Sequence, residues 1–285
     1  MIRFGPAAAP RWFNQDIARF REYLDLIGTN GGTAIEFVAF PGYGTEELGR
    51  VHLLPRIARD AVVESHARGF HVNLHGPLTS EFRMVEWARD RDAYRKRFQP
   101  MLELIQVVEA GQPAPPIVVF HAAGEAPETT ADYLAWLSEE LDKRHSHARL
   151  SLELRVRNGV SDSRFDRSLE PLVSFIGRLD QTRVGICWDV AHDWENGGHI
   201  TALDPEMIRC INHVHIHDSR ADGAVHAPLA RDQVPWQDAV AMLRSAKWQG
   251  SVTLEIRYRY AAEQGEPWDV LEESLRTFQT VLAGE

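Results

Sequence analysis

The feature of this sequence that most constrains its fold is a regular alternation of short apolar segments with longer segments of helical periodicity. The apolar segments are rich in β-branched residues, which is typical of strands buried on both faces of a parallel sheet. Eight strands are predicted, at Ile2–Phe4, Ala34–Phe40, His71–His75, Ile117–His121, Leu150–Leu154, Val184–Asp189, His213–His217 and Val252–Arg257. Because a helical segment follows each strand as a crossover, the pattern predicts an α/β fold.

The segments between the strands have the spacing of amphipathic helices. Apolar residues recur at this spacing in two early segments, at Ile17, Phe20, Leu24 and Ile27 and at Leu53, Leu54, Ile57, Ala58, Ala61 and Val62. Both runs stop near a glycine, at Gly28 and Gly69, as helices commonly do. Further helices are predicted at Asp90–Glu109, Thr130–Arg144, Leu169–Leu179, Pro205–Cys210, Trp236–Ala246 and Trp268–Leu282.

The chain is long enough to bury one large hydrophobic core. It has 285 residues, of which 44% are hydrophobic, and a single α/β barrel typically has about 250 residues. We expect one domain over residues 1–285, because no linker or low-complexity segment interrupts the alternation. The two cysteines, Cys187 and Cys210, are too few for a disulfide framework, and we expect both to be buried.

Charge and hydropathy limit the partners of the chain. Its formal net charge is −10, with 41 acidic and 31 basic residues, so no overall field attracts it to nucleic acid or anionic lipid. No apolar run reaches the roughly 18 residues of a membrane helix, and Met1–Gly5 does not resemble a secretory leader. We therefore expect a cytoplasmic protein with no membrane partner.

The positions of polar residues favour a closed barrel over an open doubly wound sheet. They gather at the ends of the predicted strands, at His75, His121, Glu153, Asp189, His215 and Glu255. In a barrel these ends converge on one face around one axis, whereas an open sheet would spread them along a line. The sequence therefore predicts a single (β/α)8 TIM barrel.

Four of these residues have the chemistry of a metal site. A carboxylate at the end of a buried strand must be paired or coordinated, because burying it alone costs several kcal/mol or more. Three carboxylates and one imidazole form a set with mostly oxygen donors, which suits Mn²⁺, Mg²⁺, Co²⁺ or Zn²⁺. The predicted ligands of a divalent metal ion are Glu153, Asp189, His215 and Glu255.

The same residues lie in motifs that resemble a known superfamily. The motifs are Leu152-Glu153, Trp188-Asp189-Val190-Ala191-His192, His213-Val214-His215-Ile216-His217-Asp218-Ser219 and Leu254-Glu255-Ile256. Together they resemble the xylose isomerase-like TIM-barrel superfamily over essentially the whole chain. That superfamily includes sugar isomerases, ketose 3-epimerases, inosose dehydratase and the endonuclease IV type of abasic-site nuclease.

Resemblance to the ketose-epimerase branch implies a sugar isomerase or epimerase. Glu153 and Glu255 would then act as acid and base on opposite faces of a metal-chelated substrate, in addition to binding the metal. The substrate would be a sugar, a sugar phosphate or a related polyol. His192 would contact substrate oxygens, and Arg220 would assist it.

Resemblance to the endonuclease IV branch implies an alternative, a phosphodiesterase with a multinuclear zinc site. The histidines that match it, and that would bind a second metal or the substrate, are His75, His121, His192 and His226. The nuclease pattern has an aspartate two residues before the last histidine, where this chain has Ala224. The basic, aromatic loop after strand two is also absent, and Glu36 is typical of small-molecule members. A sugar isomerase or epimerase is therefore favoured over the nuclease, and the sequence leaves open whether nucleic acid is a partner.

Two further predictions concern the substrate and His217. Arg155 lies just beyond Glu153, where its guanidinium could hold a phosphate or carboxylate of the substrate or pair with a nearby aspartate. Glu36, Arg155 and Arg220 are the predicted substrate-binding residues. His217 is expected to face away from His215 and to be structural. The sequence leaves open the number of metal ions and any association of identical chains.

Overall fold

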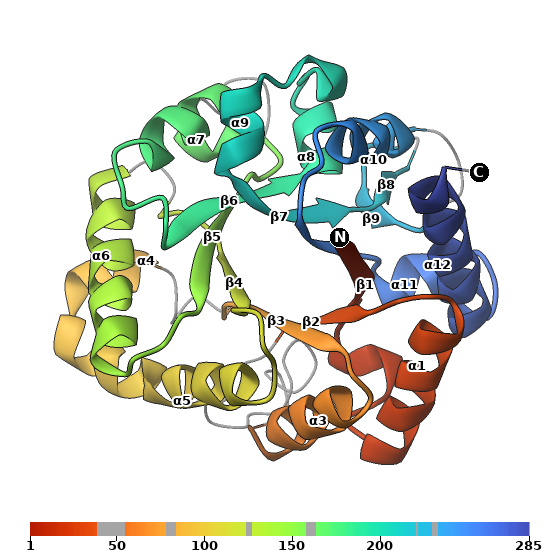
Figure 1. Ribbon diagram of the computed structural model, residues 1–285, viewed down its shortest axis with the longest axis horizontal. Coiled ribbons are helices and arrows are strands. Elements are labelled where there is room, and N and C mark those ends of the chain that lie inside the picture. Colours follow the sequence, from red (N-terminus) through yellow and green to blue (C-terminus); the bar gives the residue numbers. More distant parts are fainter. Residues whose placement is uncertain are drawn as a thin grey trace.

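Eight parallel strands close into a barrel in the order β1-β10-β7-β6-β5-β4-β3-β2 (Figure 1). The computed structural model describes residues 1–38, 55–77, 84–123, 127–157, 164–220, 222–229 and 233–284. The barrel strands are β1 (Ile2–Ala8), β2 (Ala34–Val38), β3 (His71–His75), β4 (Ile117–Phe120), β5 (Arg149–Glu153), β6 (Val184–Asp189), β7 (Ile211–Ile216) and β10 (Gly250–Leu254). The predicted (β/α)8 barrel is therefore confirmed.

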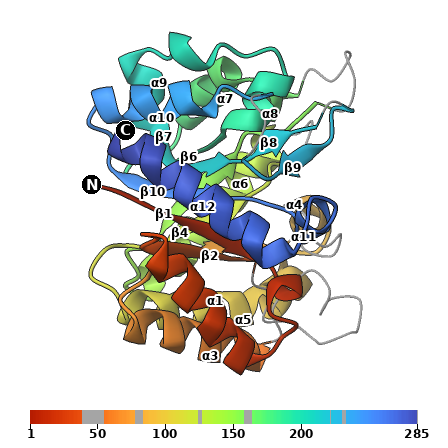
Figure 2. The same ribbon diagram turned by 90° about the vertical axis from the view of Figure 1, so that its right-hand side faces the viewer.

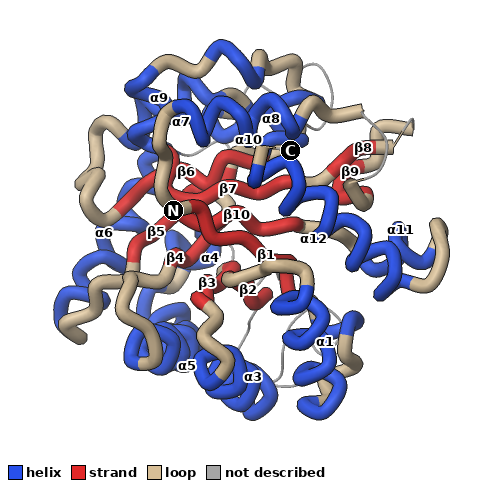
Figure 3. The backbone as a smooth tube through the Cα atoms, turned by 45° about the vertical axis from the view of Figure 1, so that its right-hand side comes forward, coloured by secondary structure: helices blue, strands red, loops and turns tan. Residues whose placement is uncertain are grey.

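A ring of helices surrounds the barrel and packs its apolar faces against the strands (Figures 1 and 3). The α-helices are α1 (Ile17–Thr29), α3 (Pro55–Ala67), α4 (Met84–Arg89), α5 (Arg91–Ala110), α6 (Pro127–Lys143), α7 (Leu169–Ile176), α8 (Val190–Glu195), α9 (Pro205–Cys210), α10 (Trp236–Ser245), α11 (Tyr258–Ala262) and α12 (Pro267–Ala283). Short 3-10 turns lie at Pro10–Trp12, Phe165–Arg167 and Ile200–Ala202. None of the helices in the described ranges is both long and apolar enough to cross a membrane.

Helix caps and aromatic packing stabilise the ring of helices. Asp16 and Asp90 begin α1 and α5, because their carboxylates accept hydrogen bonds from backbone N–H groups of the first turns. Where α4, α5 and α6 meet, five buried aromatic rings stack edge to face or face to face, namely Trp87, Tyr94, Phe98, Tyr133 and Trp136. Such rings contribute buried area together with favourable ring–ring geometry.

The observed elements differ from the predicted ones at their ends and in three short helices that were not predicted, α4, α8 and α11. The second predicted strand, Ala34–Phe40, ends at Val38 within the described residues, and Leu53 and Leu54 lie outside them. Glu255 falls just past the end of β10, where its N–H still donates to the carbonyl of Ile216 at 3.0 Å.

An antiparallel pair, β8 (Asp218–Ser219) and β9 (Val225–Ala227), was not predicted. Its strands are too short to show an alternating pattern. Figure 2 shows the barrel from the side, with β8, β9 and α11 at the opposite end from the N-terminus. This end carries the carboxyl ends of the barrel strands and therefore the candidate site.

Candidate metal centre

The four predicted metal ligands meet at the carboxyl end of the barrel. Glu153 ends β5, Asp189 ends β6, His215 lies in β7 and Glu255 follows β10. Each contributes one ligand atom, and these atoms all lie within 4.8 Å of one another. The neighbouring strands set this arrangement, because Asp189 pairs in register with His215. Four residues that are far apart in the sequence thus form one group.

This group is largely buried, and two of its carboxylates have lowered pKa values. Asp189 and His215 are inaccessible to solvent, whereas the side chain of Glu255 is 21% exposed. Burial alone would raise the pKa of Glu153, but the adjacent His121 and His75 outweigh it and hold that pKa well below its usual range. Burial likewise opposes ionisation of Asp189, but His192 and His217 lower its pKa. Both carboxylates are therefore held in the anionic form that binds a cation.

The unpaired atoms of the group fit a shared cation. Nδ1 of His215 and Oε2 of Glu255 are 3.2 Å apart and buried, yet neither forms an aligned hydrogen bond with any described residue. Buried polar atoms are rarely left in this state without an ion or water between them. Three carboxylates and one imidazole can supply the hard donors that Mn²⁺, Mg²⁺, Co²⁺ or Zn²⁺ accepts. The residues present thus fit a divalent ion.

A second group of potential ligands shares Glu153. Nε2 of His121 lies 2.8 Å from Oε2 of this carboxylate, and Nε2 of His75 lies 3.2 Å from the same oxygen. The three residues again offer ligand atoms within 4.8 Å of one another. Burial lowers the pKa of both imidazoles, and the adjacent Glu153 raises it. The result is a raised pKa for His75 and a lowered pKa for His121.

A third group consists of three buried histidines, His192, His217 and His226. Nδ1 of His192 lies 3.0 Å from Oδ2 of Asp189, and Nε2 of His217 lies 3.2 Å from the same oxygen. The prediction that His217 faces away from His215 is wrong. Residues two apart on an extended chain point to the same side, so the His213-Val214-His215-Ile216-His217 alternation was the signal that could have placed it.

Local backbone geometry positions this third group. Oδ1 of Asp189 accepts the N–H of His192 at 2.9 Å, so the carboxylate caps α8 and leaves Oδ2 for the histidines. His226 has φ +67° in β9, a left-handed conformation that costs energy outside glycine. Its N–H donates to Nδ1 of His217 at 2.9 Å, which helps to hold this conformation.

Glu36 contacts two histidines of β7 from within the barrel, and its predicted role in substrate binding stays a prediction. It is fully buried on β2. Its carboxylate contacts Nε2 of His213 at 2.7 Å, Nε2 of His215 at 3.2 Å and the hydroxyl of Thr253 at 3.1 Å. A carboxylate behind an imidazole fixes the orientation of that ring. The geometry therefore supports a role for Glu36 in positioning His215.

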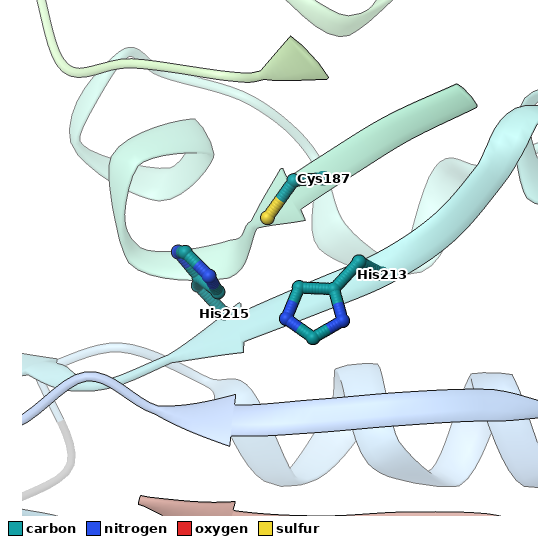
Figure 4. Close-up of side chains that lie close together, drawn as sticks. All are labelled: Cys187, His213 and His215. Atoms are coloured by element: carbon teal, nitrogen blue, oxygen red, sulfur yellow. The ribbon is translucent and has the colours of Figure 1, made fainter. Parts of the chain in front are cut away.

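Cys187 completes the floor of the centre. It lies on β6, paired in register with His213 on β7, and Figure 4 shows its sulfur beside His213 and His215. Burial raises the pKa of its thiol far above the usual value. Cys187 and Cys210 are both free and buried, as expected from the sequence.

The two predicted arginines follow strands, with Arg155 just after β5 and Arg220 just after β8. Arg220 pairs with Glu263 and with Asp222, whose carboxylate is 3.4 Å away. Asp222 therefore faces Arg220 at the surface, with 62% of its side chain exposed. Arg155 is half-buried just after β5, and its N–H donates to the carbonyl of Asp166 at 2.8 Å. The loop after β2, at residues 39–47, lies outside the described residues.

Comparisons with known proteins agree with this architecture. Residues 15–281 match the family model described as xylose isomerase-like TIM barrel. No curated protein sequence matches the chain. Among solved structures, D-psicose 3-epimerase from Clostridium cellulolyticum H10 superimposes with a TM-score of 0.71 at 12% identity, with 99% of this chain and 98% of that chain covered.

Two further solved structures are similar over almost their whole length. L-ribulose 3-epimerase has a TM-score of 0.71 at 12% identity, with 100% of this chain and 95% of that chain covered. A D-tagatose 3-epimerase-like protein has a TM-score of 0.66 at 16% identity, with 99% of this chain and 98% of that chain covered. At these identities the likeness establishes the fold.

Proposed function

Because the chain belongs to the xylose isomerase-like TIM-barrel family, we propose that it is a divalent-metal-dependent isomerase or epimerase of a sugar, sugar phosphate or related polyol. One observation carries the proposal: Glu153 and Glu255 belong to a single four-residue ligand group that also contains Asp189 and His215. Such a group can bind a cation and still present two carboxylates to a chelated substrate. The solved structures described above are of 3-epimerases or of a 3-epimerase-like protein, and they support the same class of reaction.

The proposed ligands are Glu153, Asp189, His215 and Glu255, with Glu36 holding the ring of His215 from below. When bound, a divalent ion would supply positive charge next to the substrate oxygens as negative charge develops on them. Mn²⁺, Mg²⁺, Co²⁺ and Zn²⁺ all accept this donor set.

Glu153 and Glu255 would move the proton. One carboxylate removes a proton from the carbon next to the substrate carbonyl, and the electron pair of the broken C–H bond moves onto the carbonyl oxygen. The other glutamate can return a proton to the opposite face of the same carbon, which gives the epimer. It can instead return the proton to the former carbonyl carbon, while the hydroxyl proton on the first carbon passes to the former carbonyl oxygen, and this gives the isomer. His192 lies beside Asp189 and would hold a substrate hydroxyl, and Arg155 and Arg220 would approach the substrate from the rim.

Hydrogen exchange tests the proposal directly. The metal-loaded protein is incubated in D₂O with a panel of ketopentoses, ketohexoses, their phosphates and keto-inositols, and products are analysed by proton NMR. We expect deuterium at the carbon next to the carbonyl of the true substrate, together with its epimer or isomer. Absence of exchange across the panel by protein that contains its metal would contradict the proposal.

A second candidate function is hydrolysis of phosphodiesters, with abasic nucleic acid as substrate. The observation that favours it is the presence of two further ligand groups, one with His75 and His121 and one with His192, His217 and His226. Where the nuclease pattern has an aspartate this chain has Ala224, and the third member of the third group is instead His217. Cleavage of an abasic duplex oligonucleotide that is lost in His121→Ala would favour this function.

Metal stoichiometry separates the two candidates. About one ion per chain fits the isomerase, in which the additional histidines bind substrate, and two or three ions fit the phosphodiesterase. A cytoplasmic location, a sugar-like substrate and association of identical chains stay predictions.

A further inference from the structure

A second depression lies at the opposite end of the barrel from the metal centre. It has a volume of about 260 Å³ and is lined largely by residues at the beginnings of barrel strands. Arg3 belongs to β1, His71 to β3, Arg149 to β5 and Ser251 to β10. β1 and β5 lie on opposite sides of the closed barrel, so the two arginines approach the depression from opposite walls. In Figure 2 this end is the one where the N-terminus lies.

The lining is positively charged and contains no carboxylate among the described residues. Arg3 and Arg149 are both half-buried, and neither forms an ion pair with a described residue. By contrast, the half-buried Arg183 and Arg220 each pair with a carboxylate. Partial burial of a guanidinium without a counterion costs free energy, because the charge loses part of its hydration and gains no ion pair in return.

Arg149 in particular lacks partners for its donors. Its Nε is buried and has no hydrogen-bond partner in the described part of the chain, and its Nη2 makes only a 3.4 Å contact with the carbonyl of Gln181. Burial lowers its pKa, and no acidic group offsets this effect. Burial and the charge of Arg3 lower the pKa of the adjacent His71 to about 4, so His71 is a neutral imidazole at pH 7.

We propose that this depression binds the phosphate group of a small anion. Arg3 and Arg149 supply the charge, because a guanidinium can present two parallel N–H donors to phosphate oxygens. The neutral His71 and the hydroxyl of Ser251 can donate to the remaining oxygens. The volume is below the about 300 Å³ at which pockets for drug-sized ligands begin, so it suits inorganic phosphate or a short phosphorylated metabolite.

The proposal does not depend on the reaction at the metal centre, which lies at the other end of the same strands. A bound anion here would join strands from opposite sides of the barrel. It is therefore expected to raise the melting temperature, since a ligand that binds only the folded state stabilises it.

Calorimetric titration with inorganic phosphate tests the proposal on the metal-loaded protein, with chloride at equal ionic strength as the blank. Arg149→Gln and Arg3→Gln are each expected to raise the Kd by about tenfold or more, because each removes a charge-assisted contact. The control is Arg59→Gln, since Arg59 is exposed on α3 and does not line the depression. It should bind phosphate as tightly as the wild type.

A second arm compares inorganic phosphate with glycerol phosphate. Equal Kd values indicate recognition of the phosphate group alone, and tighter binding of glycerol phosphate indicates that the carbon chain also contacts the lining. The proposal is overturned if the wild type binds neither anion, or if Arg149→Gln binds phosphate as tightly as the wild type while its circular dichroism spectrum is native.

Discussion

The carboxylate of Glu36 lies directly behind the ring of His215, with Oε1 of the glutamate 3.2 Å from Nε2 of the histidine. The opposite ring nitrogen, Nδ1, lies 3.2 Å from Oε2 of Glu255. One imidazole thus links a buried carboxylate below with the proposed ligand group above. Burial would lower the pKa of His215, but Cys187, Glu36 and Glu255 raise that pKa well above its usual value.

Glu36→Gln should weaken metal binding without removing a ligand. The amide is neutral and cannot hold the ring of His215 as strongly, so we expect the metal affinity to fall by about 10- to 100-fold. Competition with a chromophoric chelator measures this change. Glu103→Gln is the control, because Glu103 is exposed on α5 and should leave the affinity unchanged. Equal affinities in the two variants would exclude a positioning role for Glu36.

Glu255→Gln and Glu153→Gln should each reduce turnover on the true substrate by at least about 100-fold, because each removes a group that moves the proton. Loss of deuterium exchange at the carbon next to the carbonyl measures the chemical step apart from product release. Metal content must be measured in the same samples, since both residues are also proposed ligands. Full turnover in metal-loaded Glu255→Gln would show that this carboxylate is not the acid or base.

Removal of the metal should destabilise the fold as well as abolish turnover. Four barrel strands or their ends supply the ligand group, so the ion binds the folded state alone. At an ion concentration of 100 times the Kd, the expected stabilisation is about 2.7 kcal/mol. Thermal melting before and after dialysis against a chelator measures it, and restoring the ion should restore the melting temperature. An unchanged melting temperature would mean that the group holds no ion in the folded protein.

Gly5→Ala should destabilise the barrel strongly. A Cβ atom at Gly5 would lie 1.7 Å from the backbone carbonyl oxygen of Ala34 on β2, so the two strands would have to move apart. We expect a loss of about 3 kcal/mol or more in the free energy of unfolding. Urea denaturation measures it. The matched control is Gly28→Ala in α1, where the nearest atom, Cζ of Phe70, is 3.6 Å away.

Gly28→Ala should leave the free energy of unfolding unchanged or raise it slightly, because alanine favours a helix more than glycine does. If Gly5→Ala unfolds at the same urea concentration as Gly28→Ala, β1 and β2 are not packed as closely as described.

The sequence by itself determined the barrel and the composition of its polar end. Strand and helix periodicity is a local property, so β6 and α9 occur at the predicted residues. Parallel strands bring their carboxyl ends to one face, which is why Glu153 and Asp189, 36 positions apart, could be assigned to one group.

Only the tertiary structure decided which polar side chains face one another. It placed Glu36 under His215 because β2 and β7 lie across the barrel interior from each other, a relation that no spacing in the sequence encodes. It also brought His226 to His217 through the short β8–β9 pair, and Arg3 to the same depression as Arg149. These contacts depend on strand register, barrel closure and a left-handed residue, which are set by packing among distant segments rather than by local pattern.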